Sequence, residues 1–139
     1  GISNHQVGYA VDLSLVKVKK SEVCVSGGFK YSHVVSYTEY EMPTQMHELS
    51  IAACVYNIPL PSLDRTAWKN YPYSSMMNTN ARRLQNYMTK VGMTPLASEW
   101  WHFNDIDAYE RLGGKGGNGN YVINQCQSIP MYPKTVKSV

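Results

Sequence analysis

The chain has 139 residues, of which 43% are hydrophobic and 17% charged, and its formal net charge is +3. This length and composition predict one folded domain and exclude a disordered tail. No Lys/Arg run is longer than Lys19-Lys20, which argues against a nucleic-acid partner, and no apolar run approaches the ~18 residues that a membrane span needs.

The first predicted strand covers residues 9–18, after a loop rich in Gly, Ser and Asn. Val11, Leu13 and Leu15 alternate with polar or mixed positions, which is typical of a strand with one apolar face. The elements predicted next are a hairpin turn at 19–22, a short return strand at 23–25 ended by the glycines 27–28, and a strand at 29–40.

Asp12 lies on the mixed face of the first predicted strand, away from Val11 and Leu13. A carboxylate within a hydrophobic strand is costly unless it is paired or bound to a metal. Without a partner, a solvated position would be the plain interpretation. His5, seven residues earlier and across Gly8, is the predicted partner.

The clearest helix is predicted over residues 79–91, where an apolar stripe has helical spacing. Asn78 or Asn80 is expected to cap its start, and Gly92 marks its end. The stripe consists of Leu84, Tyr87, Met88 and Val91. We expect the helix to pack on the back of the sheet through Leu84, Tyr87 or Met88, and Val91.

The aromatic run Trp100-Trp101-His102-Phe103 predicts a strand, and its aromatic side chains are expected to fill the core, with shielding of the site as the alternative. Strict alternation would place Glu99 and His102 on opposite faces. For both to reach one metal-bound water, Glu99 must lie in the preceding turn or at a bulge.

Residues 113–120 are glycine-rich and predict a flexible loop, since no phosphate-binding G-x-x-x-x-G-K-[ST] pattern is present. A last short strand is predicted at 121–123. His33 is interpreted as an ordinary residue, because no second candidate metal ligand lies at a suitable sequence spacing from it. The cysteines Cys24, Cys54 and Cys126 allow at most one disulfide and are expected to be small buried residues.

Glu99 and His102 supply what a zinc hydrolase needs, which is a nitrogen ligand and a nearby carboxylate that stays off the metal and takes a proton from water. His5 and Asp12 add a second nitrogen and an oxygen ligand. With His102 they make three protein ligands and leave a fourth position open. The sequence therefore predicts one Zn²⁺ per chain.

Two segments carry a resemblance to a known family: Ser3-x-His5-x-x-Gly8-x-Ala10-x-Asp12 and Glu99-Trp100-Trp101-His102. They resemble the signature motifs of the zinc D-Ala-D-Ala dipeptidase/carboxypeptidase family, which includes the vancomycin-resistance dipeptidases and has hedgehog-type domains as fold relatives. Every fixed position of both motifs matches, and the likeness covers roughly residues 1–104.

The resemblance implies an α+β fold of the hedgehog/DD-peptidase type, with an antiparallel sheet and a helix packed on one face. Residues 1–139 would then be a single zinc peptidase domain, its catalytic part. It also implies His5, Asp12 and His102 as zinc ligands, Glu99 as catalytic base and Ser3 at the substrate site.

The chain departs from the family at two places. The family carries an arginine upstream of the first motif, and residues corresponding to that segment are not in this sequence, so we expect weak activity, an exposed sheet edge and a tendency to associate. The missing segment could act as a separate polypeptide, and Arg65 is the first local replacement to test. The second departure is His47, which stands where the dipeptidases have an aspartate for the free amine, with Glu48 beside it as a possible substitute.

The expected activity is hydrolysis of D-Ala-D-Ala, as free dipeptide or at the end of peptidoglycan stem peptides. The alternatives are a cell-wall endopeptidase of the same fold, of the L-Ala-D-Glu type, and a non-catalytic, hedgehog-like zinc-binding module. Glu99 argues against the last, because a structural zinc site needs no base. A peptidoglycan substrate favours the cell envelope or secretion over the cytoplasm.

Overall fold

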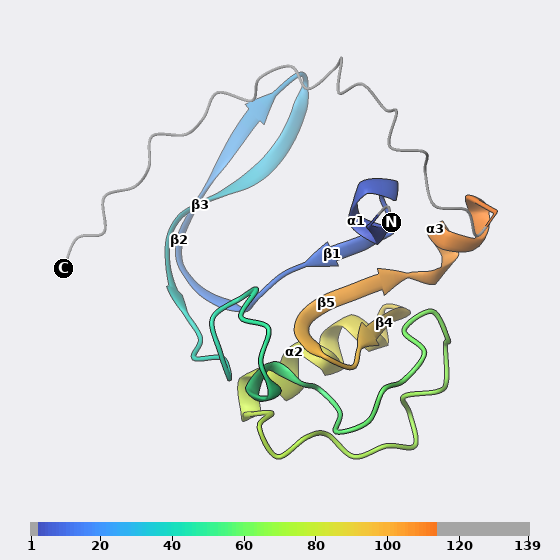
Figure 1. The fold of residues 1–139 in the computed structure, drawn as a ribbon. Coiled ribbons are helices and arrows are strands. Elements are labelled where there is room, and N and C mark those ends of the chain that lie inside the picture. Colours follow the sequence, from blue (N-terminus) through green and yellow to red (C-terminus); the bar gives the residue numbers. More distant parts are fainter. Residues whose placement is uncertain (1–2, 114–139) are drawn as a thin grey trace.

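The computed structural model describes residues 3–113 (Figure 1). It has an α+β fold with a three-stranded antiparallel sheet, a two-stranded hairpin and a few helices. The predicted strand at 121–123, Cys126 and nearly all of the predicted glycine-rich loop lie outside the described residues.

The three-stranded sheet has the order β1-β5-β4, so that β5 (Glu99–Asp105) pairs with β1 (Ala10–Asp12) on one side and with β4 (Met93–Leu96) on the other. Asp12 lies directly opposite His102 in this register. The sheet therefore brings together the two motifs, as expected. Within residues 3–113, β1 is an edge strand, which agrees with the predicted exposed edge.

A register irregularity in the β4–β5 ladder lies close to Glu99. Pro95 pairs with Phe103, but the next residue, Leu96, pairs with Glu99, so that β5 has extra residues over this interval. A bulge changes the direction of the side chains that follow it. This confirms the condition set by the sequence, that Glu99 lies at a turn or bulge if it is to share a site with His102.

The hairpin consists of β2 (Val16–Ser26) and β3 (Phe29–Glu39), and Figure 1 shows it extending away from the helices. The prediction of one strand over 9–18 and a turn at 19–22 is wrong. The turn is Gly27-Gly28, where both residues have positive φ (58° and 82°), the backbone conformation that a two-residue hairpin turn favours. The polar run 19–22 continues the strand because its residues are exposed, and polar side chains are tolerated there.

The long helix is α2 (Thr79–Lys90), capped by the Asn78 side chain, which accepts a hydrogen bond from the Ala81 N–H. The helix prediction is confirmed, and Leu84 and Met88 of the predicted stripe face the core, but the other two residues of the stripe do not. Tyr87 and Val91 are 54% and 74% exposed, and the fully buried residues are Ala81, Leu84 and Gln85. The core-facing side extends beyond the predicted stripe to Gln85, because the Gln85 amide donates to the Trp100 carbonyl (2.9 Å) and so keeps a hydrogen bond in the core.

The remaining elements are α1 (Asn4–Val7), a 3₁₀ turn, η1 (Ile51–Ala53), and α3 (Ile106–Arg111). None of the helices among residues 3–113 is long and apolar enough to cross a membrane. Cys24 and Cys54 are free thiols and only half-buried, in contrast to the expected burial.

The core lies around β5, where Trp100, Trp101 and Phe103 are buried, as expected for the aromatic run. Consecutive residues of a strand point to opposite faces, so burial of adjacent residues means that both faces of β5 are covered. Among the buried residues that surround the strand are Ala53, Val55, Tyr56, Met77, Ala81 and Leu84. His102 is thus held in a rigid strand.

Candidate metal centre

Helix α1 and the glycine after it place His5 above the sheet. The Ser3 hydroxyl accepts from the His5 N–H (3.1 Å), and the Ser3 N–H donates to Gln6 Oε1 (2.9 Å), which together form a capping box. Gly8 has φ 89° and ends the helix before β1. The described contacts of Ser3 are those of a helix cap, and its role toward substrate stays a prediction.

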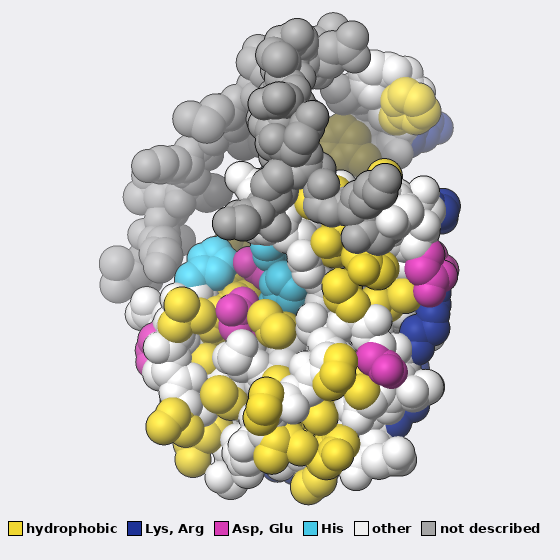
Figure 2. Space-filling model, turned by 45° about the vertical axis from the view of Figure 1, so that its right-hand side comes forward, with side chains coloured by type: hydrophobic (Ala, Val, Ile, Leu, Met, Phe, Trp, Pro, Cys, Tyr) yellow, Lys and Arg dark blue, Asp and Glu magenta, His cyan; other side chains and the backbone are white. Residues whose placement is uncertain are grey.

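Three donor atoms from α1, β1 and β5 converge. His5 Nε2 lies 3.1 Å from His102 Nδ1, and Asp12 Oδ1 lies 3.3 Å from the first and 3.2 Å from the second. A tetrahedral ion with ligand distances near 2.1 Å separates its ligands by about 3.4 Å. The triangle therefore has the dimensions that one small metal ion requires, and Figure 2 shows histidine and acidic side chains meeting on one face of the molecule.

The Asp12 carboxylate also points to a cation. Its Oδ1 is buried and forms no hydrogen bond of regular geometry with the described residues, although it lies 3.3 Å from His5 Nε2 and 3.2 Å from His102 Nδ1. Leaving a buried carboxylate oxygen unsatisfied is unfavourable. A metal ion bound by the three donor atoms would remove that penalty, so the residues present fit such an ion.

Glu99 lies beside the three ligands and is not one of them. Its Oε2 is 3.9 Å from His102 Nδ1, and its side chain is 22% exposed. The group of possible metal ligands contains His5, Asp12 and His102 without Glu99. The Glu99 carboxylate is therefore a neighbour of the three possible ligands and does not belong to their group.

His47 contacts Asp12, one of the possible metal ligands, whereas the sequence assigned His47 to substrate. Its Nε2 is 3.0 Å from Asp12 Oδ2, and its ring meets Trp101 edge-on at 5.8 Å. Its φ of 68° is uncommon for a residue other than glycine. His47 thus contacts the second oxygen of the carboxylate whose first oxygen faces the two imidazoles.

Glu48 has a different environment. It accepts a hydrogen bond from the Ser50 hydroxyl (3.2 Å), and no described contact connects it with the three possible ligands. Its role toward substrate stays a prediction.

The sequence analysis missed two buried or half-buried asparagines that support the site. The Asn104 side-chain oxygen faces His102 Nε2 (3.1 Å) and accepts from the Asn4 amide (2.8 Å), and the Tyr9 hydroxyl donates to Asn4 (2.9 Å). One signal was available, because each asparagine lies within two residues of a predicted histidine ligand and Asn104 is a polar residue in an otherwise aromatic strand.

Arg65 forms ion pairs with residues of α3 and none with the possible metal ligands among residues 3–113. Its guanidinium lies 2.7 Å from Asp107 and 2.9 Å from Glu110, and the hydrogen bonds to these two carboxylates raise the pKa of Arg65. Among residues 3–113 no described interaction joins an arginine to the three possible ligands. The structure thus offers no support for Arg65 as a replacement for the family's upstream arginine.

Comparison with known proteins gives no match, neither to a family model, nor to a curated protein, nor to a solved structure. The functional interpretation therefore rests on the residues and geometry described above.

Proposed function

We propose that this chain is a zinc metallopeptidase of the D,D-peptidase type with a hedgehog/DD-peptidase-like fold. The main support is the triangle of ligand atoms from His5, Asp12 and His102, whose sides measure 3.1–3.3 Å. The Glu99 carboxylate lies beside this triangle and is not part of it. Two imidazoles and one carboxylate are a usual set for catalytic zinc, whereas Ca²⁺ and Mg²⁺ prefer oxygen ligands.

The division of roles follows from position. When bound, zinc acts as a Lewis acid and lowers the pKa of water at its open position toward ~7. Glu99, 3.9 Å from a ligand nitrogen, accepts the proton as water attacks the scissile carbonyl and then passes it to the departing amine. His47 contacts Asp12 and supports the orientation of that ligand.

The surroundings favour the end of a longer peptide over the free dipeptide. A free dipeptide carries an ammonium group, whose natural partner is a carboxylate. Here the two nearby carboxylates are already engaged, because Asp12 contacts the His47 imidazole and Glu48 accepts a hydrogen bond from Ser50. An acylated peptide has no such ammonium group at this position.

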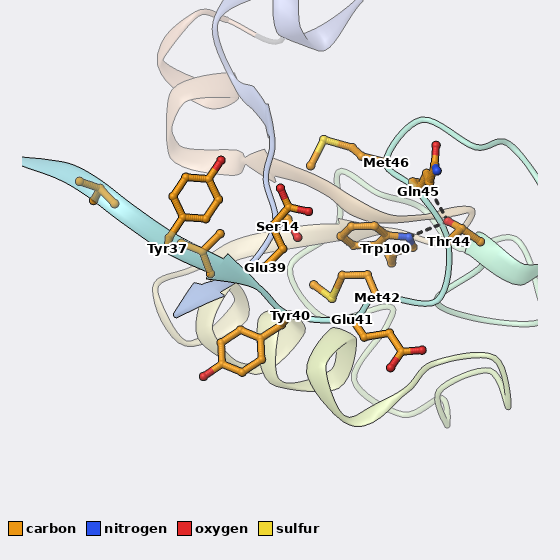
Figure 3. Close-up of a pocket in the computed structure, with 12 residues that line it drawn as sticks. Ser14, Tyr37, Glu39, Tyr40, Glu41, Met42, Thr44, Gln45, Met46 and Trp100 are labelled. Carbon is orange, nitrogen blue, oxygen red and sulfur yellow. Dashed lines mark hydrogen bonds between the residues drawn. The ribbon is translucent and has the colours of Figure 1, made fainter. Parts of the chain in front are cut away.

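We infer that a longer chain would run toward a hollow whose lining includes close sequence neighbours of Asp12 and His47 but none of the possible ligands. A hollow of about 710 Å³ lies between the base of the hairpin and the loop before His47 (Figure 3). Ser14, two residues beyond Asp12, and Met46, adjacent to His47, both line it. Trp100 forms part of the wall, and its indole N–H donates to the Thr44 hydroxyl (2.9 Å).

The test is release of D-Ala by the zinc-loaded chain. An N-acylated peptide ending in D-Ala-D-Ala and free D-Ala-D-Ala are supplied in parallel, with and without a chelator. We expect chelator-sensitive release, faster from the acylated peptide. Equal or faster release from the free dipeptide would contradict the preference for a longer peptide.

The same assay separates the alternatives. Cleavage of an L-Ala-D-Glu bond with no release of D-Ala would identify the endopeptidase. Tight zinc binding with no cleavage of either bond would overturn the enzyme proposal and favour the non-catalytic module.

A further inference from the structure

The contact between His102 and Asn104 selects one form of the histidine. His102 Nε2 lies 3.1 Å from Asn104 Oδ1, and Asn104 is fully buried. An amide oxygen only accepts hydrogen bonds. His102 Nε2 must therefore carry the proton, which leaves the lone pair on Nδ1, the atom that faces His5 and Asp12.

The direction of the Asn104 amide is fixed by its other neighbours. Its NH₂ group faces the Ser62 carbonyl (3.5 Å), and its oxygen accepts a second hydrogen bond from the Asn4 NH₂ group (2.8 Å). If the Asn104 amide were reversed, its oxygen would face the Ser62 carbonyl, and two acceptors would repel each other. The Ser62 carbonyl thus decides which end of the amide meets His102.

Asn4 connects the two segments that bear the ligands. It precedes His5 in α1, and its own oxygen accepts from the Tyr9 hydroxyl (2.9 Å). Asn104 follows His102 by two residues in β5. The amide pair therefore holds α1 against β5 at the level of the metal position.

We propose that Asn104, oriented by Ser62 and Asn4, is a positioning residue that presets His102 as the Nε2–H tautomer for metal binding. This inference rests on the metal site of the proposed function. His5 has no equivalent, since no hydrogen bond to its Nδ1 comes from the described residues, so that His102 is the preorganised ligand of the pair. Hydrogen bonds of this kind fix the tautomer and ring orientation of metal-binding histidines.

The first experiment needs no mutation. In the metal-free chain with ¹⁵N-labelled histidine, at mildly alkaline pH, two-bond ¹⁵N–¹H correlations report the tautomer of each imidazole. We expect His102 in the Nε2–H form. Finding the proton of His102 on Nδ1 would overturn the proposal.

The second experiment measures Zn²⁺ affinity by competition with a chromophoric chelator. Asn104→Leu removes the acceptor and should weaken zinc binding 10–100-fold, the usual effect of losing such a partner. Asn104→Asp keeps an acceptor for Nε2–H but turns a second oxygen toward the Ser62 carbonyl, so it should weaken zinc binding less than Asn104→Leu does. Asn86→Leu, on the exposed face of α2, is the matched control and should have no effect.

Folding of each variant is checked by circular dichroism. If Asn104→Leu fails to fold, Asn4→Ala replaces it, because it leaves Asn104 in place and removes one of the groups that hold it. If Asn104→Leu folds and its zinc affinity is unchanged, the role of Asn104 as a positioning residue is contradicted. The same holds for Asn4→Ala where it replaces Asn104→Leu. The proposed function would stand in either case. Absence of zinc binding in the unaltered chain, together with the Nε2–H tautomer, would instead overturn the proposed function.

Discussion

The chain has two phenylalanines, one in each of its β regions, and their surroundings are opposite. Phe103 lies in the middle strand β5 and is 0% exposed, whereas Phe29 begins β3 at the tip of the hairpin and is 79% exposed. Both regions are antiparallel ladders. Hydrogen-bonded pairing of strands alone therefore does not decide where a rigid site can form.

The difference lies in what covers each ladder. Strand β5 has a neighbour on each side and buried residues on both faces, so that His102 and Glu99 are held at defined positions. The hairpin is largely exposed on both faces, and an isolated pair of strands is marginal in stability. The three possible metal ligands belong to the three-stranded sheet and to α1, which packs beside it.

The largest expected effect is on turnover. Glu99→Gln keeps the shape of the side chain but removes the base, so the rate of D-Ala release should fall by ~10²–10⁴. Zinc stoichiometry should stay near one per chain. Glu22→Gln, at an exposed position of β2 outside the hollow, is the control and should retain the activity. Loss of zinc from Glu99→Gln would show that Glu99 is a ligand and not the base.

The next prediction compares the two phenylalanines directly. Phe103→Ala removes a fully buried ring and should lower the free energy of unfolding by about 3–5 kcal/mol. Phe29→Ala should change it by no more than about 0.5 kcal/mol. Chemical denaturation monitored by tryptophan fluorescence measures both. Equal losses would mean that the tip of the hairpin is covered in solution.

Metal binding should stabilise the sheet. An ion that binds only the folded chain adds about 2.7 kcal/mol when its concentration is 100 times Kd. A thermal melt with and without zinc measures this gain, and His102→Ala should abolish it. His33→Ala, in the hairpin, is the matched histidine control and should keep it. Loss of the zinc effect in His33→Ala would contradict the interpretation of His33 as an ordinary residue.

The smallest effect is expected at the hairpin turn. Gly28 has φ 82°, and a side chain in this left-handed region is unfavourable by roughly 1–2 kcal/mol. Gly28→Val should therefore increase amide hydrogen exchange along β2 and β3. Exchange in β5 and zinc affinity should stay as they are, and a loss of zinc affinity would show that the hairpin and the site are coupled.

The sequence by itself determined the features that local chemistry controls. The helix at Thr79–Lys90, its Asn78 cap and the aromatic strand could be read from periodicity and residue type. The possible ligand set of His5, Asp12 and His102 could also be read, because residue type and spacing narrow the candidates. The set of possible metal ligands is thus the part of the site best predicted from sequence.

Only the tertiary structure decided how these features meet. The hairpin turn was misplaced because the polar run at 19–22 resembles a turn, whereas its exposure allows a polar strand. The helix face was only partly predicted, because burial of Gln85 depends on a hydrogen bond to the Trp100 carbonyl, which belongs to another element. The contact of Asn104 with His102 depends on Ser62 and Asn4, which lie in other segments of the chain. Asn4 comes close because β1 pairs with β5, and Ser62 comes close from the loop that precedes α2. Periodicity describes one segment at a time, and such contacts between distant segments arise only when the whole chain folds.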